Sequence, residues 1–278
     1  MRKSREQSLR MMPGNVVLVV LAFTALLPIF LVFLNSLKTA PEVVRNPLAF
    51  PAVLDWGNYV EAWKYAKFGT GFKNSVLLTG TTILVVLLTA APAAYVLAER
   101  KIKAARPVMV YLMVAMTVPI QLFLFPLYAV FAKAGLISNV FAVGIIIAAI
   151  NLPLAIMLLR TFFLGIPKEL PEAATMDGAN TFQVLRHILL PAVSPGLITV
   201  GIIVGLNAWN EYLISVTFLQ SESSYTATLG FLSLTGTFAV DQGVLMAGAA
   251  ILILPIVVLF LIAQRSFVDG LVSGSVKG

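Results

Sequence analysis

The chain has 278 residues, of which 59% are hydrophobic and only 11% are charged, and its mean hydropathy is +0.96. So few polar residues cannot cover the surface of a globule, so the composition excludes a soluble fold. The chain has no cysteine and one histidine, His187, which excludes disulfides and clustered thiolate or imidazole metal sites. The net charge of +7 then indicates cations retained on one side of a bilayer rather than a nucleic-acid partner, and we expect no cofactor.

Six charge-free segments are each longer than the roughly 20 residues that cross a hydrocarbon core. These segments cover residues 11–37, 74–98, 107–132, 134–159, 187–210 and 242–264. The sequence therefore predicts an all-α, polytopic membrane protein with six transmembrane helices. The third and fourth segments meet at "FAKAGLISN", where Gly135 and Asn139 predict a tight turn between two antiparallel helices.

The distribution of lysine and arginine predicts the orientation of these helices. Thirteen of the 19 cations lie in the N-terminal segment, the second-to-third and fourth-to-fifth connections and the C-terminal tail. By the positive-inside rule, both termini face the cytoplasm. The first apolar run is too long for a cleaved signal sequence, so we expect a retained anchor. We expect a cytoplasmic segment over residues 1–14, a transmembrane domain over 15–265 with a cytoplasmic loop over 166–191, and a cytoplasmic tail over 266–278.

Two connections are expected outside the cytoplasm. In the 38–73 connection, Trp56, Tyr59 and Trp63 recur at the spacing of one helix face, and Asn58 with Glu61 resembles a capping box. This pattern favours a helix lying at the membrane interface, with docking of a soluble partner as the alternative. The 219–241 connection is rich in Ser, Thr and Gly, and we expect an adaptable loop with an apolar centre.

Polar residues inside a membrane span are costly and therefore informative. Asn207, Asn210 and Glu211 are spaced to share one face of the fifth span, with Glu211 near its outer end. Such a stripe either joins helices or lines an aqueous translocation path. Prolines inside spans predict kinked or broken helices, in particular at Pro92, Pro119, Pro126, Pro153 and Pro255.

Two classes of transport protein fit these features. A secondary transporter or channel usually carries several buried charges and an internal repeat, but this chain has one marginal acid and no convincing repeat. A primary transporter needs ATP, yet no G-x-x-x-x-G-K-[ST] phosphate loop occurs. Motifs of an intramembrane enzyme are also missing. We therefore expect no enzymatic activity in this chain; if ATP drives transport, a separate subunit binds it.

One cytoplasmic stretch favours the second class. From Glu172 to Pro191 the chain reads "EAATMDGANTFQVLRHILLP", in which E-A-A is followed after three residues by Gly178 and after nine more by I-x-L-P. This spacing resembles the EAA signature of the membrane subunits of binding-protein-dependent ABC importers. The resemblance implies that an ATPase docks on the signature residues, which are Glu172, Ala173, Ala174, Asp177, Gly178, Ile188, Leu190 and Pro191.

The resemblance covers nearly the whole chain. "NYVEAW", "NSVLLT", "AAPAAYVLAERK", "VPIQLFLFPLY", "AWNEYL" and "RSFVDGLVSGSVKG" are similar to the carbohydrate-uptake branch, in particular to the smaller membrane subunit of the maltose transporter. That branch implies the type I ABC importer permease fold in a bacterial or archaeal inner membrane. The implied partners are a second permease subunit, a cytoplasmic ATPase dimer and an extracytoplasmic solute-binding protein. A non-sugar solute such as a glycerol-phosphate compound is the alternative substrate.

Local signals predict how the EAA stretch folds. Glu169 and Glu172 fall in the first turns of a short helix, where the helix dipole favours anions. Gly178 follows that helix, and Asn180 or Thr181 is placed to cap a second helix that runs to Pro191. The resemblance identifies this helix–turn–helix as the coupling element, and it implies further contacts of the tail with the ATPase and of the 219–241 connection with the binding protein.

Overall fold

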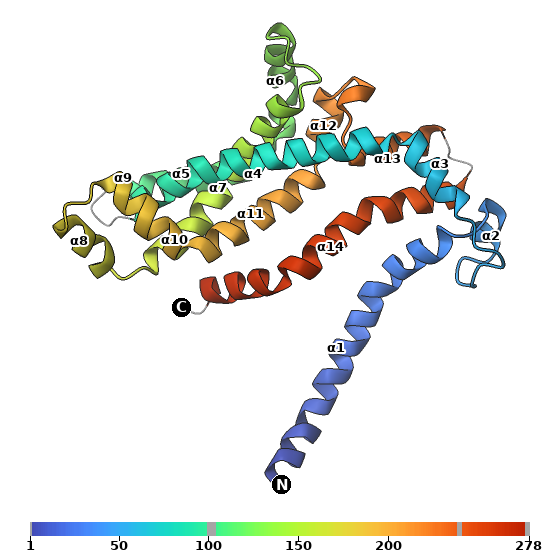
Figure 1. Cartoon of the computed structure of the whole chain (residues 1–278), viewed down its shortest axis with the longest axis horizontal. Coiled ribbons are helices and arrows are strands. Elements are labelled where there is room, and N and C mark those ends of the chain that lie inside the picture. The colour runs from blue at the N-terminus through green and yellow to red at the C-terminus, as the bar shows by residue number, and fades with distance from the viewer. Residues whose placement is uncertain (1, 99–103, 238–240, 276–278) are drawn as a thin grey trace. The chain divides into compact units, whose positions relative to one another are not determined.

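The computed structural model describes residues 2–98, 104–237 and 241–275, which form helices joined by short turns, with no strand in these ranges (Figure 1). Four helices are each long and apolar enough to cross a membrane. They are α1 (Arg2–Asn35), α4 (Phe68–Ala98), α7 (Val140–Leu164) and α14 (Gln242–Ser275). The apolar spans are Asn15–Asn35 within α1 and Gln242–Ile262 within α14. Helices therefore continue into both the predicted N-terminal segment and the predicted C-terminal tail.

The two remaining predicted spans are bent pairs of helices. α5 (Ala105–Thr117) and α6 (Gln121–Lys133) meet at 91°, and the helical run Thr181–Ala192 meets α11 (Ser194–Trp209) at 75°. The prediction of six spans agrees with the structure if each bent pair counts as one span. The break at Pro119 agrees with the kinked or broken helices predicted from proline, whereas the bend between Ala192 and Ser194 lies at none of the prolines named above.

Proline position explains the sharper bend. Pro119 restricts the residue before it, and Val118 accordingly has the extended values φ −80° and ψ 120° that end α5. The other four predicted kink prolines lie inside continuous helices, which are α4, α6, α7 and α14. The turn predicted between the third and fourth spans is confirmed, because Gly135 has φ +68° and the Asn139 side chain accepts the Ala142 N–H at the start of α7.

The chain divides into two compact units, which are described separately. The larger unit comprises Gly69–Gly230 and Pro255–Gly278. Its core lies where α4, α7 and α11 pack together, with Val86, Leu159 and Val200 fully buried. Gly144 permits a close approach, because a Cβ there would lie about 3.0 Å from the Thr81 side chain. This packing through small residues is typical of membrane helices.

The remaining elements of the larger unit are short. They are α8 (Glu169–Met176), α9 (Thr181–Val184), a π-helical turn at Leu185–Leu189, α10 (Leu190–Ala192), α12 (Leu213–Phe218), a 3-10 turn at Glu222–Ser224 and the start of α13 (Ala227–Thr237). The smaller unit comprises Met1–Phe68 and Phe231–Leu254, and contains α1, α2 (Ala40–Arg45) and α3 (Gly57–Tyr65).

The expectation of an adaptable loop over 219–241 is wrong for its described part. Bonds to α4 hold the start of this connection in place, because Asn74 Nδ2 donates to the carbonyls of Ser223 and Tyr225 and Ser75 Oγ accepts the Ala227 N–H. α13 follows directly. These bonds join residues about 150 positions apart in the chain, so local sequence gave no sign of them. Residues 238–240 lie outside the described ranges.

Candidate functional site

The EAA stretch folds as two helical segments joined at a glycine. α8 ends in a Schellman motif, in which the Gly178 N–H donates to the Thr175 carbonyl and the Ala179 N–H donates to the Ala174 carbonyl. Gly178 has φ +89°, in the left-handed region that favours glycine. A Cβ at this glycine would meet nothing within 4 Å, so the backbone conformation rather than crowding within the chain favours glycine here.

A capping box begins the second helical segment. Asn180 Oδ1 accepts the Gln183 N–H at 2.9 Å, and Gln183 Oε1 accepts the Asn180 N–H at 2.8 Å. The helical path continues through α9, the π-helical turn and α10 to Ala192. The predicted helix–turn–helix is therefore confirmed, and its cap is Asn180 rather than Thr181.

The structure divides the predicted docking residues into two groups. Ala174 is buried, and Ile188 and Leu190 are partly buried against the same apolar core, so these three attach the loop to the larger unit. The remaining five are exposed, and they are Glu172, Ala173, Asp177, Gly178 and Pro191. The exposed group is therefore accessible to a partner.

Two exposed apolar side chains on this loop were missed by sequence reasoning. Met176, the last residue of α8, is 88% exposed, and Phe182 in α9 is 65% exposed. They flank the Gly178 turn, one on each helix. Together with Gly178 they form one exposed surface, which we call the coupling surface after the role proposed for it below. The one clue to them in the sequence was that both residues lie close to the glycine of the EAA pattern, although neither belongs to that pattern.

Within the membrane part, the structure pairs Asn207 with a residue that sequence reasoning did not consider. Asn207 Nδ2 on α11 donates to Asn151 Oδ1 on α7 at 2.9 Å. Asn151 Nδ2 in turn donates to the Ile147 carbonyl of its own helix. Asn210 is the C-cap residue of α11, and its Nδ2 donates to the carbonyl of Leu206 in the same helix. The polar contact between α7 and α11 is thus the Asn151–Asn207 amide pair.

Glu211 does not share a helix face with the two asparagines, because α11 ends at Trp209. Its carboxylate accepts the backbone N–H of Ile214 at 2.6 Å and of Ser215 at 2.8 Å, and the Ser215 hydroxyl at 2.9 Å. The carboxylate therefore caps α12, where the positive end of the helix stabilises an anion. The prediction that Glu211 shares a polar helix face with Asn207 and Asn210 is therefore wrong.

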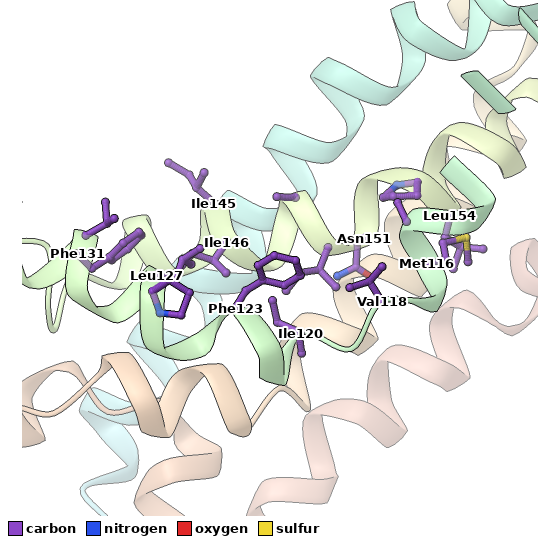
Figure 2. Close-up of a pocket in the computed structure, with 16 residues that line it drawn as sticks. Met116, Val118, Ile120, Phe123, Leu127, Phe131, Ile145, Ile146, Asn151 and Leu154 are labelled. Carbon is purple, nitrogen blue, oxygen red and sulfur yellow. The ribbon is translucent and has the colours of Figure 1, made fainter. Parts of the chain in front are cut away.

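An apolar cavity of about 870 Å³ lies between the α5–α6 bend and α7 (Figure 2). Met116, Phe123, Leu127 and Ile146 are among its lining residues, and Asn151 is its one amide (Figure 2). A sugar-binding site needs several hydrogen-bonding groups, because each sugar hydroxyl that enters must exchange its water contacts for protein contacts. This cavity is therefore unsuited to a sugar.

The comparisons with known proteins agree with the fold. Residues 90–272 match the family described as binding-protein-dependent transport system inner membrane component. The chain is 34% identical to the melibiose/raffinose/stachyose import permease MelC of Bacillus subtilis over the full length of both proteins. It is 33% identical to the trehalose transport system permease SugB of Mycobacterium tuberculosis, covering 91% of this chain and 93% of that protein.

A solved structure has the same fold. A chain of a bacterial ABC transporter involved in the import of the acidic polysaccharide alginate superposes with a TM-score of 0.76, at 24% identity, over 95% of this chain and 98% of that chain. The matched family region includes the whole helix–turn–helix with the coupling surface. This chain thus belongs to the family of inner membrane components of binding-protein-dependent transport systems, the permease subunits of ABC importers.

Proposed function

We propose that this chain is one of two permease subunits of an ATP-driven importer for a small oligosaccharide, and that it is coupled to ATP hydrolysis through the coupling surface. The substrate class is supported by the relatives named for melibiose, raffinose, stachyose and trehalose, which are similar over nine-tenths or more of this chain. A glycerol-phosphate compound is the alternative substrate within the same mechanism. The protein itself is a transport subunit and not an enzyme.

One observation carries the coupling role. The EAA loop is fixed by its own backbone bonds in a shape that exposes Met176 and Phe182 on either side of Gly178. Apolar side chains held on a rigid element lose little conformational freedom on docking, which favours tight seating in a partner cleft. Exposed Glu172 and Asp177 beside them favour basic groups at the rim of that cleft. Because the chain has no phosphate loop, the partner that accepts this surface supplies the ATP site.

The orientation follows from the cation distribution and belongs to the same proposal. Residues 1–14, 166–191 and 266–278 face the cytoplasm, where the ATPase dimer docks on the loop and the tail gives a second contact. Residues 15–265 form the transmembrane domain. The solute-binding protein delivers substrate to the opposite face, which includes the 219–241 connection.

The amide groups are our candidates for the translocation path. Asn207 lies in the apolar helix α11 and Asn210 is its C-cap residue, and both are exposed. The neighbouring indole nitrogen of Trp209 is buried and has no hydrogen-bond partner among the described residues. Buried polar groups are generally paired, so this indole N–H would bind water or a sugar hydroxyl along such a path. Glu211 contributes only indirectly, by holding α12 beside the path.

Transport in liposomes tests the proposal. We expect the chain, reconstituted with a second permease, an ATPase pair and a binding protein, to accumulate labelled raffinose only when ATP is supplied. Unlabelled glycerol 3-phosphate should not compete; if it competes and raffinose does not, the substrate class is wrong. Uptake by the purified chain alone, driven by an ion gradient, would replace this proposal with a secondary transporter.

A further inference from the structure

The connection after α1 presents a set of exposed apolar side chains outside the membrane spans. Phe50 is 79% exposed, Val60 is 69% exposed and Trp56 is 62% exposed. Further members with about half or more of their surface exposed are Val44, Leu48, Val53, Leu54 and Trp63. A soluble surface rarely gathers so many large apolar residues in one short segment, so this surface has a partner.

In helix α3, the buried, the exposed apolar and the exposed charged side chains lie on different faces of the helix. At about 100° per residue, Asn58 and Ala62 fall on one side of the helix, and both are buried. Trp56, Val60 and Trp63 fall together on a second side and are exposed, whereas Glu61 lies on a third side, also exposed. The exposed part of this helix is thus itself divided into an apolar face and a charged face.

A buried lysine fixes this connection to the end of α1. Lys38 is only 1% exposed, and its Nζ donates to Asn35 Oδ1 at 2.9 Å and to the carbonyls of Asn46 at 2.9 Å and Pro47 at 3.2 Å. These three acceptors use the three N–H groups of the ammonium. Burial lowers the pKa of Lys38, and the nearby Glu42 carboxylate partly opposes that shift.

Bonds from α3 complete the attachment. Asn58 Nδ2 donates to the carbonyls of Ser36 and Lys38, so this residue is not the helix cap that its spacing from Glu61 predicted. The Tyr59 and Ser36 hydroxyls lie 2.7 Å apart. Asp55 Oδ1, rather than Asn58, accepts the Gly57 N–H at the start of the helix.

The same group of residues meets the start of α14. A Cβ at Gly243 would lie 2.4 Å from the Lys38 carbonyl oxygen, so only glycine allows this contact. The apolar span of α1 ends at Asn35 and that of α14 begins at Gln242. The connection is therefore held where two spans of the smaller unit reach the same boundary of the membrane.

We propose that residues 44–63 form a membrane-interface anchor, whose apolar face lies in the headgroup and upper acyl region of the lipid leaflet outside the cytoplasm. Two observations favour lipid over a protein partner. The apolar face of Trp56, Val60 and Trp63 is held at the boundary of two spans, and tryptophan is enriched at this depth of a bilayer. The adjacent charged face at Glu61 is what a helix lying in the interface plane turns toward water.

Spin labels test the anchor directly, because the chain has no cysteine and each label site is unique. Val60→Cys labels the apolar face, and Glu61→Cys is the matched control one residue along the same helix. The full chain, purified with its copurifying subunits, is placed in nanodiscs of phosphatidylethanolamine and phosphatidylglycerol. Collisions with oxygen, which partitions into lipid, and with a water-soluble nickel chelate are then measured.

We expect the label at 60 to collide several-fold more with oxygen than with nickel, and the label at 61 to show the reverse ratio. Strong nickel collisions at both positions would place the helix in water and overturn the proposal. Exclusion of both reagents at 60 would show that a protein subunit covers this face. A label at 60 that loses collisions only when a binding protein is added would assign the surface to that protein. None of these outcomes depends on the substrate or on the ATPase, so the anchor and the proposed transport function fail separately.

Discussion

The EAA loop and the connection after α1 are both built from short helices, but different bonds hold them. In the loop, the ordering polar bonds join residues within five positions of one another, as in the Gly178 turn and the Asn180 cap. In the connection, the ordering bonds reach from Lys38 and Asn58 to separate segments, and Gly243 of α14 packs against both residues.

This difference has a mechanical consequence. The loop attaches to its unit mainly through apolar contacts of Ala174, Val184 and Leu189, which are not directional. It can therefore shift as a rigid piece without leaving buried polar groups unpaired. The connection cannot leave the span ends without exposing or orphaning the Lys38 ammonium and its acceptors. The first arrangement suits an element that transmits motion, and the second suits an anchor.

The largest effect is expected at the glycine of the loop. Gly178→Val places a side chain in the left-handed region, at a cost of roughly 1–2 kcal/mol, and adds bulk to the coupling surface. Because about 1.4 kcal/mol corresponds to a tenfold change in an equilibrium, we expect stimulation of ATP hydrolysis by binding protein and sugar to be lost while the spans still insert. Hydrolysis is measured in the purified complex.

Gly135→Val is the matched control for that variant. Gly135 has a similar φ of +68° and equally open space around it, but it lies in the turn before α7, away from the coupling surface. Both valine variants therefore introduce the same backbone strain, but only Gly178→Val changes the coupling surface. Equal loss of stimulation in both variants would show that strain alone is responsible and that the loop is only a connector.

An intermediate effect is expected from the buried lysine. Lys38→Met leaves the buried Asn35 amide oxygen without this donor, and an unsatisfied buried group costs about 1–3 kcal/mol. We expect a lower yield of folded complex and a lower temperature of thermal inactivation than for Lys64→Met, which removes an exposed ammonium on α3. If both variants behave alike, the bonds of the Lys38 ammonium do not hold the connection and the comparison with the loop fails.

The smallest effect is expected at the amide pair, which extends the comparison into the spans. Interhelical hydrogen bonds of this kind contribute about 0.6 kcal/mol on average. Asn207→Leu and Asn151→Leu should each lower complex yield slightly, and the double variant should be no worse than either one. Additive losses would show that the two amides act independently.

Asn210→Leu separates a path role from a packing role. Asn210 bonds to the carbonyl of its own helix, so we expect unchanged yield and unchanged basal ATP hydrolysis. Slower sugar uptake would then place Asn210 on the path. Lower yield with normal uptake per complex would instead assign it to helix packing.

Sequence reasoning succeeded where structure depends on near neighbours. Gly178 and Asn180 act on residues three to five positions away, so their spacing alone predicted the turn and the cap. The six predicted apolar segments correspond to four long helices and two bent pairs for the same reason, because hydrophobic length is a local property. Met176 and Phe182 were missed because apolar residues in an apolar chain give no contrast until their exposure is known.

It failed at helix boundaries and where residues far apart in the chain are bonded. Pro119 ends a helix and Pro126 does not, although both lie in one predicted span, and the chain pattern does not distinguish them. The ordered start of the 219–241 connection depends on Asn74 and Ser75. Glu211 was assigned to α11 because the pattern continued, whereas its carboxylate forms stronger bonds by capping the next helix.

Site-specific photocrosslinking from position 176 tests the coupling surface most directly. A photoreactive residue replaces Met176 in the full chain, the complex is assembled in native membrane and irradiated, and the adducts are identified by mass spectrometry. The account predicts a dominant adduct with the ATPase subunit, and no such adduct from a photoreactive residue at Val60. Adducts from 176 that fall only on lipid or on the second permease would contradict the assignment of this loop as the site that receives the work of ATP hydrolysis.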